Sequence, residues 1–267
     1  MRRLAAALGV VLVLAGCGDG GKAGRRSAVN AYLNSVNSTE RDLSFQLGQI
    51  NQAYRGFSLK GDTAKQTPKL LEAERAIRDV RSRLAALHPP ADAAGLHRRL
   101  LHLFALDVAF AHEVTGISVY LPELARTLAL LGPEDVRLRA SMRNAKKASE
   151  QGQALARYAA ALTPVLARLR ALTPPEVLAP THRAQLARLT TLRRLSLELG
   201  AAIAKRDRPR VNALVARYRA VQGAAARVAL LQAQAAAIKA YDQRLFRISG
   251  AQSDLLRERG RVERLLN

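Results

Sequence analysis

The sequence predicts an all-α protein, arranged as an antiparallel bundle of about five or six long helices. Apolar residues recur at three- and four-residue intervals through most of the chain, and the alternating pattern of a β-strand is nearly absent. Gly and Pro separate these periodic stretches, and short connections favour antiparallel neighbours. With 267 residues, the chain is long enough for one large helical domain or two small ones.

The first two helices are bounded by clear breaks. The first is expected from about residue 27 to residue 57, ending near Gly56 and residues 60–62. The second is expected from residue 67 to residue 87, with Thr67 as its cap and Pro68 at its first position. His88-Pro89-Pro90 must end this helix, because the residue before a proline is pushed out of the helical region.

The remaining helices are placed in the same way. A third is expected from Asp92 to Leu131, a fourth from Gly132-Pro133 to Leu172 with a kink at Pro164, a fifth from Ala179 to Lys205, and a sixth from Asp207 to Leu265. Thr173-Pro174-Pro175 separates the fourth from the fifth. The sixth is long for one straight helix, so an interruption is expected at Gly223 or at Ser249-Gly250.

An internal repeat relates two parts of the chain. Residues 81–101 and 166–186 align without a gap at an offset of 85, and the double proline, the histidine at 97 or 182 and most of the leucines recur. The repeat predicts two related helical hairpins that each turn at a double proline. Two copies are too few for a solenoid array.

The N-terminus has the features of an export signal. Arg2 and Arg3 precede an apolar run from residue 4 to residue 14, and small residues then lead to Cys17, the only cysteine. A run this short cannot span a bilayer core, which needs about 20 apolar residues. It fits the apolar region of a secretory signal.

The stretch Leu14-Ala15-Gly16-Cys17 resembles the lipobox of bacterial lipoproteins. The resemblance implies a diacylglyceryl group on the Cys17 sulfur, cleavage before Cys17, and often acylation of the new amino terminus by a chain such as palmitate. Residues 1–16 are then the signal peptide, residues 17–26 a flexible tether and residues 27–267 the helical bundle domain. The alternatives are an ordinary secretory signal with an unrelated cysteine, or an uncleaved apolar N-terminus.

The chain is strongly basic, with 43 Lys and Arg against 21 Asp and Glu. Removing Arg2 and Arg3 with the signal leaves 41 against 21, a net charge near +20. This charge favours a polyanionic partner, namely anionic lipid, a wall polymer or another envelope protein, or it is simply a solvated basic surface. Nucleic acid is not expected, because the chain is exported and its scattered basic residues lack interleaved aromatic residues.

The third helix carries the clearest candidate for a buried polar group. Its apolar seam comprises Leu100, Leu103, Phe110, Val114, Ile117, Leu121, Leu124 and Leu128, and Asp107 is the only charged residue on it. A carboxylate on such a seam must be paired, hydrogen-bonded or protonated. Asp107 is therefore either a functional acid or ligand inside the bundle, or a structural polar residue that fixes the helix register.

Further polar residues lie on or near the same helix. His102 and Glu113 lie on another face, with His97 and His112 nearby. No two histidines are four residues apart and no Glu-x-x-His sequence is present, so no metal site is expected. His97 and His182 are either a pair of ligands or pH-responsive groups, or they are capping and packing residues.

The sequence contains no recognisable catalytic set. Neither a Gly-x-Ser-x-Gly elbow nor a phosphate-binding glycine loop is present, so no enzyme activity and no cofactor are expected. We expect a lipid-anchored lipoprotein on the outer face of a cell membrane, acting as a non-enzymatic binding or scaffold module of the envelope. The alternative is a small-ligand or metal-binding lipoprotein associated with a transporter or sensor, with Asp107, His102, Glu113, His97 and His182 around its site.

Overall fold

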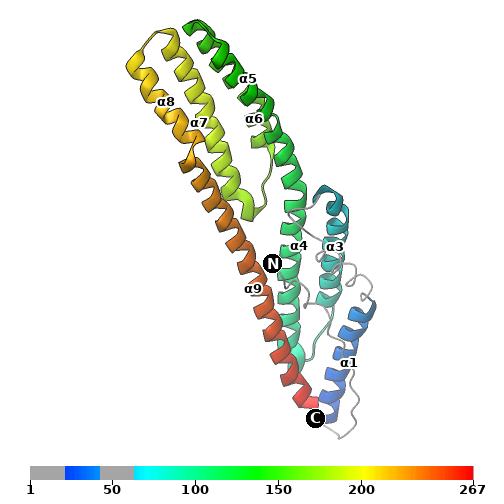
Figure 1. Cartoon of the computed structure of the whole chain (residues 1–267). Helices are drawn as coiled ribbons and strands as arrows, with labels where there is room; N and C mark the ends of the chain where they lie inside the picture. The colour runs from blue at the N-terminus through cyan, green and yellow to red at the C-terminus, as the bar shows by residue number, and fades with distance from the viewer. Residues whose placement is uncertain (1–21, 43–62, 267) are drawn as a thin grey trace. The chain divides into compact units, whose positions relative to one another are not determined.

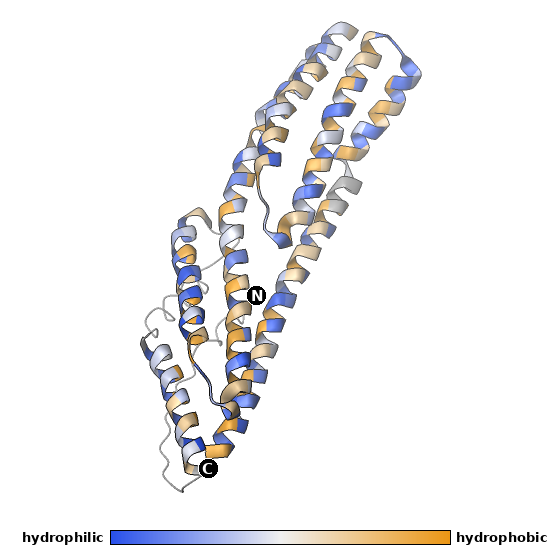
Figure 2. Ribbon diagram, turned by 180° about the vertical axis from the view of Figure 1, so that it is seen from behind, coloured by the Kyte–Doolittle hydropathy of each residue, from blue (hydrophilic) through white to orange (hydrophobic). Residues whose placement is uncertain are grey.

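The computed structural model describes residues 22–42 and 63–266, and Figure 1 shows their arrangement. The described residues form helices joined by short connections, and none of them lies in a β-strand. The all-helical prediction is therefore confirmed. Figure 2 shows that hydrophobic and hydrophilic residues are interspersed along every helix, as expected where one stripe of each helix packs inward.

The helices follow one another along the chain in a simple order. They are α1 (Lys22–Asp42), α3 (Thr63–Ala85), α4 (Ala94–Ala129), α5 (Leu131–Asn144), α6 (Ala148–Ala171), α7 (Ala179–Ala204), α8 (Arg208–Gln222) and α9 (Ala224–Leu266). Two 3₁₀ helices, η1 (Ala91–Ala93) and η2 (Glu176–Leu178), precede α4 and α7.

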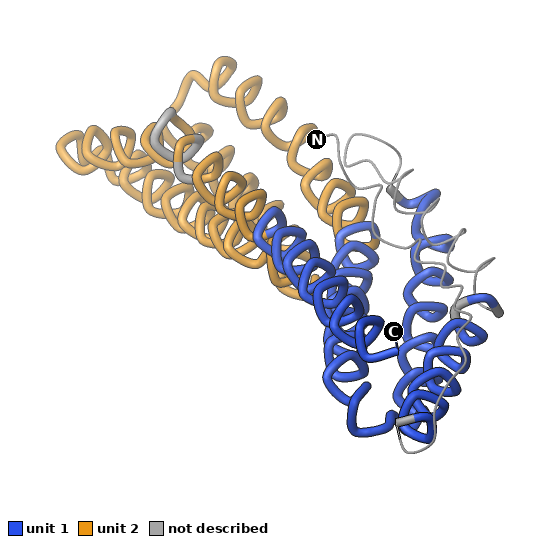
Figure 3. The backbone as a smooth tube through the Cα atoms, turned by 90° about the horizontal axis from the view of Figure 1, so that it is seen from below, with its two compact units in different colours: residues 1–118, 241–267 blue, residues 119–240 orange. Residues whose placement is uncertain are grey.

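The chain divides into two compact units, coloured separately in Figure 3. Unit 1 comprises residues 1–118 and 241–267, and unit 2 comprises residues 119–240. Both α4 and α9 contribute residues to each unit.

Unit 1 is held together by apolar side chains from α1, α3, α4 and α9. One cluster joins α1, α3 and the start of α4, and includes Leu33, Val80, Leu84 and Phe104. A second joins α3, α4 and α9, and includes Leu70, Val114 and Ile248. The sequence-predicted seam is largely buried here, because Leu100, Leu103, Phe110, Val114 and Ile117 are each less than 9% exposed.

Unit 2 is packed mainly through leucine. The central cluster comprises Leu162, Val165, Leu166 and Leu169 of α6 with Leu189 and Leu192 of α7, and Leu131 and Tyr158 extend it. A second cluster adds Leu155, Leu195, Leu199 and Leu214, and so brings α8 against α6 and α7. Fully burying one such leucine contributes about 1.5–3 kcal/mol.

The internal repeat has the same local structure in both copies. The 3₁₀ helices at 91–93 and 176–178 are offset by the same 85 residues as the aligned sequences. Pro90 and Pro175 are both extended, with ψ of 160° and 152°, and neither can continue the preceding helix. The double proline therefore separates a helix from a 3₁₀ turn in each copy.

Two helix starts differ from the prediction. Helix α1 begins at Lys22 rather than near residue 27, so it includes residues 22–26 of the expected tether. Lys22, Ala23 and the two arginines favour a helix, and only Gly24 opposes it. Helix α3 begins at Thr63, and the Thr67 hydroxyl bonds Ser118 Oγ at 3.0 Å instead of capping the helix. The predicted end of the first helix, at residue 57, lies outside the described residues.

The prediction of a single helix from residue 132 to residue 172 is wrong, because residues 145–147 separate α5 from α6. Gly132 and Pro133 lie within the first turn of α5, and the predicted break between two helices is found at Leu130, between α4 and α5. The Glu150 carboxylate accepts the backbone N–H groups of Lys146 and Lys147 at 2.8 and 3.2 Å, and so caps the start of α6. Pro164 lies inside α6 without ending it.

The last part of the chain is interrupted once, at one of the two predicted places. Asp207 caps α8 by accepting the Arg210 N–H at 3.1 Å, and Gly223 separates α8 from α9. A Cβ at residue 223 would lie 2.8 Å from the Arg219 carbonyl oxygen, so this position requires glycine. Residues 249–250 do not interrupt α9.

Helix α7 ends in a Schellman motif. The Asp207 N–H bonds the Ala202 carbonyl at 3.0 Å, and the Arg206 N–H bonds the Ile203 carbonyl at 3.0 Å. The motif places Arg206 at a φ of +54°, and among the described residues it is the only non-glycine with positive φ. Glycine is the usual residue here, because a side chain in this conformation costs about 1–2 kcal/mol.

Helices α6 and α7 approach closely where two glycines meet. A Cβ added at Gly152 would lie 3.1 Å from the Gly200 carbonyl oxygen, and a Cβ at Gly200 would lie 3.1 Å from that of Gly152. Farther along, Arg193 of α7 donates to Thr163 of α6 at 3.0 Å. The order of these contacts shows that the two helices run in opposite directions.

This close approach predicts opposite effects for two glycine substitutions. Gly200→Leu should lower the free energy of unfolding by about 1–3 kcal/mol, because the backbones must separate. Gly250→Ala should raise it by about 0.5–1 kcal/mol, because Gly250 lies in α9 with no atom near its added Cβ. Chemical denaturation of both variants checks this, and a stabilised Gly200→Leu protein would contradict the described contact.

Candidate functional site

Each copy of the repeat contains a buried hydrogen bond between a histidine and a tyrosine. In unit 1, the Tyr32 hydroxyl lies 3.0 Å from His97 Nδ1, and in unit 2 the Tyr120 hydroxyl lies 2.8 Å from His182 Nδ1. The rings meet edge to face in both, with centroids 5.9 Å apart. All four residues are less than 9% exposed.

Burial favours the neutral form of both histidines. Desolvation lowers the pKa of His97, with a smaller effect from His88, and desolvation lowers that of His182, with a smaller effect from Arg183. Desolvation also raises the pKa of Tyr32 and of Tyr120 to about 12, so both hydroxyls keep their protons. A neutral imidazole can accept the tyrosine O–H at Nδ1, whereas a charged one cannot.

The histidines were identified from the repeat, but their tyrosine partners were not. Tyr32 precedes His97 by 65 residues, whereas Tyr120 precedes His182 by 62 residues, so the aligned segments do not place the tyrosines at the same offset. Tyr32 lies on α1 and Tyr120 on α4, whereas the helices that directly precede the double prolines are α3 and α6. Tyr32 and Tyr120 are 88 residues apart, so a search that allowed a small change from the repeat offset of 85 would have paired them.

Glu113 has a charged partner in unit 1. Its carboxylate lies 3.0 Å from the Arg244 guanidinium of α9, and its side chain is 7% exposed. Nearby, the buried Glu74 of α3 bonds Arg78 and accepts from His112 Nδ1 at 3.0 Å. Loss of Arg244 would leave the buried Glu113 carboxylate unpaired, at a cost of about 3–5 kcal/mol, so the pair favours one alignment of α9 on α4.

Asp107 is half-buried on α4, and no hydrogen bond or ion pair joins its carboxylate to any described residue. Desolvation raises the pKa of this carboxyl from its ordinary value to about 7. Of the three expected ways to bury this carboxylate, neither an ion pair nor a hydrogen bond is seen among the described residues, and protonation remains.

His102 lines a pocket in unit 1, between the first turns of α4 and the last turns of α9. The pocket has a volume of about 320 Å³ and is lined by Gly95, Arg98, Arg99, His102, Ala251, Asp254 and Glu258. Glu113, His97 and His182 are not among its lining residues. The predicted site residues do not form a single site.

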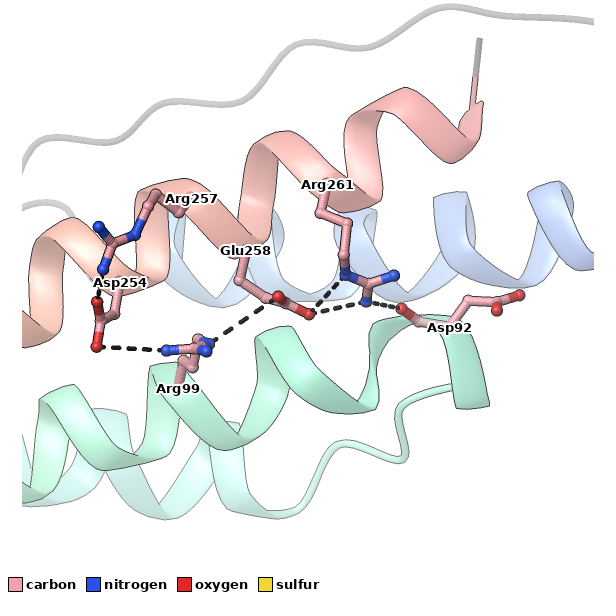
Figure 4. A network of polar contacts seen from close by, with 6 residues as sticks. All are labelled: Asp92, Arg99, Asp254, Arg257, Glu258 and Arg261. Carbon is pink, nitrogen blue, oxygen red and sulfur yellow. Dashed lines mark hydrogen bonds and ion pairs between the residues drawn. The ribbon is translucent and has the colours of Figure 1, made fainter.

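Three of the lining residues, Arg99, Asp254 and Glu258, belong to a network of ion pairs between α4 and α9, which Figure 4 shows. Arg99 lies 3.4 Å from Asp254 and 4.0 Å from Glu258, and Arg261 bonds Glu258 at 2.7 Å and the Asp92 carbonyl at 2.9 Å. The hydrogen bond from Arg261 lowers the pKa of Glu258. A Cβ at residue 95 would overlap the Glu258 carboxylate, so Gly95 admits this acid above the first turn of α4, where negative charge is favourable.

Neither a metal centre nor a clear membrane span is found in the described residues. No group of three or more His, Cys, Asp or Glu within 22–42 and 63–266 could hold a metal ion. One helical stretch, residues 91–144, is long and apolar enough to cross a membrane by composition. Half of its apolar window is buried in the fold, which is also typical of a core helix, so this is weak evidence for a span.

Comparison with protein-family models, with curated proteins and with solved structures gave no match.

The two Tyr–His pairs predict a stability that falls in mild acid. The folded-state pKa of each histidine lies below the unfolded value of about 6.5. The contribution of the two pairs to the free energy of unfolding is therefore complete above pH 6.5, and it is lost as the pH falls toward the folded-state pKa. In the double variant His97→Gln/His182→Gln this loss should disappear. Thermal melts between pH 8 and pH 5 measure it, and an unchanged acid response would contradict the assignment.

Asp107 predicts the opposite dependence on pH. Its folded-state pKa of about 7 lies above the unfolded value, so the charged carboxylate lowers the free energy of unfolding above pH 7. This destabilisation is relieved as the pH falls toward about 4. Asp107→Asn should therefore raise the free energy of unfolding by about 1–3 kcal/mol at pH 8 and change it little at pH 4. Denaturation at the two pH values tests this, and equal effects at both would refute the pKa shift.

Proposed function

We propose that this chain is a lipid-anchored lipoprotein on the outer face of a cell membrane, acting as a non-enzymatic binding or scaffold module of the envelope. The observation that carries the proposal is the position of Cys17. The only cysteine directly follows Leu14-Ala15-Gly16 at the end of an apolar run of signal length. Two or more acyl chains make membrane anchoring stable, whereas one does not.

The structure of the body supports a structural or binding role. In this proposal the body is an antiparallel helical bundle with two related hairpins that turn at double prolines. His97, His182 and Glu113 are each engaged with Tyr32, Tyr120 and Arg244, respectively, in contacts that join different helices. These contacts use the polar groups that a catalytic site would otherwise need.

The pocket beside His102 supports a second candidate, a small-ligand-binding lipoprotein associated with a transporter or sensor. The pocket combines a histidine and two arginines with two carboxylates, and the charge of Arg98 acts on Glu258 without a hydrogen bond to it. Native mass spectrometry of the purified chain separates the two candidates. A bound molecule that is lost on Arg98→Gln, but retained on substitution of the exposed Arg81 by Gln, would favour this second function.

Metabolic labelling with palmitate tests the proposed anchor. The chain expressed in bacteria should incorporate the label, enter the membrane fraction, and have a mass that begins at Cys17 and includes the diacylglyceryl group. Cys17→Ser should abolish the label, because its hydroxyl does not replace the acceptor sulfur.

Gly18→Ser is the matched control, because it changes the adjacent residue and keeps the sulfur. This variant should retain the label. A wild-type chain without label, or a Cys17→Ser chain that still carries it, would refute the anchor.

A further inference from the structure

The positive charge of the chain is concentrated in unit 2. Residues 119–240 contain 21 Lys and Arg against 7 Asp and Glu, a net charge of +14. All other residues of the chain contain 22 Lys and Arg against 14 Asp and Glu, a net charge of +8. The basic residues are scattered along the sequence, and only the fold shows which of them lie close together.

Seven of these basic side chains gather at one end of unit 2, which we call the basic tip. They are Arg143, Lys146 and Lys147 at the α5–α6 connection and Lys205, Arg206, Arg208 and Arg210 at the α7–α8 connection. All seven are exposed, and none of their side chains has a hydrogen bond or ion pair with a described residue. Their charges are therefore available to a partner.

The Gly152–Gly200 contact holds the two connections together. Gly152 follows Lys147 by five residues and Gly200 precedes Lys205 by five residues, so each connection begins about 8 Å from the glycine contact along its helix. Figure 1 shows α7 and α8 meeting at the end of unit 2 where α5 finishes. The seven side chains therefore surround one end of the packed helices.

The acidic residues closest in sequence to these cations do not neutralise their side chains. Glu150 is occupied by the backbone N–H groups of Lys146 and Lys147, and Asp207 accepts the backbone N–H of Arg210. Both carboxylates thus cap helices. The tip keeps a clear excess of positive charge.

Arg206 provides an independent indication of function at the same place. It occupies the left-handed position of the Schellman motif, where glycine would avoid the steric cost. Unfavourable backbone conformations cluster at functional sites. At this position, arginine extends the row of basic side chains and glycine would interrupt it.

We propose that the basic tip docks on an anionic phospholipid surface. No large apolar side chain is exposed within residues 141–150 or 201–212, so the tip lacks the apolar centre of a typical protein–protein interface. A bilayer surface requires only charge, and each basic side chain near it strengthens binding by about fivefold. This inference rests on the proposed function for its setting and adds a second membrane contact to the lipid on Cys17.

Vesicle co-sedimentation tests the proposal with the full chain carrying Cys17→Ser, so that no acyl chain contributes. Binding to phosphatidylcholine vesicles is compared with binding to vesicles that also contain about 30 mol% phosphatidylglycerol. We expect binding to the anionic vesicles that falls steeply between about 0.1 M and about 0.5 M salt. Substituting Lys146, Lys147, Arg206 and Arg208 together by Gln should weaken it at least about tenfold.

A matched variant distinguishes the tip from the overall charge. Arg168, Arg170, Arg217 and Arg219 are also exposed in unit 2, but they lie near the opposite ends of α6 and α8. Replacing these four by Gln removes the same charge and should weaken binding less than about threefold. Circular dichroism melts should show both variants folded, since all the substituted side chains are exposed.

The remaining outcomes overturn the proposal. An equal loss of vesicle binding in the two fourfold variants would assign binding to net charge rather than to the tip. Equal binding to vesicles with and without phosphatidylglycerol would exclude electrostatic docking on an anionic surface. Binding to soluble polyphosphate without binding to anionic vesicles would assign the tip to a polymer instead. Palmitate labelling reports on Cys17 alone, so failure of the anchor and failure of the tip are separate results.

Discussion

Leucine packing between helices is the interaction on which the rest of this structure depends. The chain has a single cysteine, no tryptophan and only 4% aromatic residues, so neither an internal disulfide nor an aromatic core can stabilise it. Each helix instead buries a stripe of leucine, valine and alanine against its neighbours. Such an interior offers few polar groups, and therefore every buried polar side chain needs a specific partner.

Most buried polar side chains of the described helices meet this requirement. Ser196 donates to a carbonyl of its own helix at 2.8 Å, and His97, His182 and Glu113 have partners on other helices. Contacts of this kind favour one alignment of neighbouring helices, because a shift along the axis would leave the partners unpaired. Asp107 has no such partner among the described residues, and burial raises its pKa so that the neutral form is favoured.

The sequence was sufficient for features determined by local chemistry. Helical periodicity predicted the all-helical class, and the double prolines and Gly223 predicted three of the breaks. The break at residues 145–147 was missed, because neither glycine nor proline marks it and a glutamate after the break caps the next helix. Similarly, the glycine contact and the polar partners of His97 and Glu113 depend on which helices meet, which periodicity does not encode. The basic tip was hidden for the same reason, since its two halves are about sixty residues apart in the chain.

The backbone of Arg206 has a consequence for the evolution and engineering of this chain. A procedure that ranks substitutions by folding stability alone would select glycine at this position, because glycine has no Cβ to clash in the left-handed region. The same choice would delete a charge from the end of unit 2. Folding stability thus favours glycine at residue 206, whereas the surface charge of unit 2 favours arginine. Variants selected for heat resistance would have fewer basic side chains at this end of unit 2. Retention of a side chain here among natural variants would indicate that selection has favoured the charge over the more stable turn.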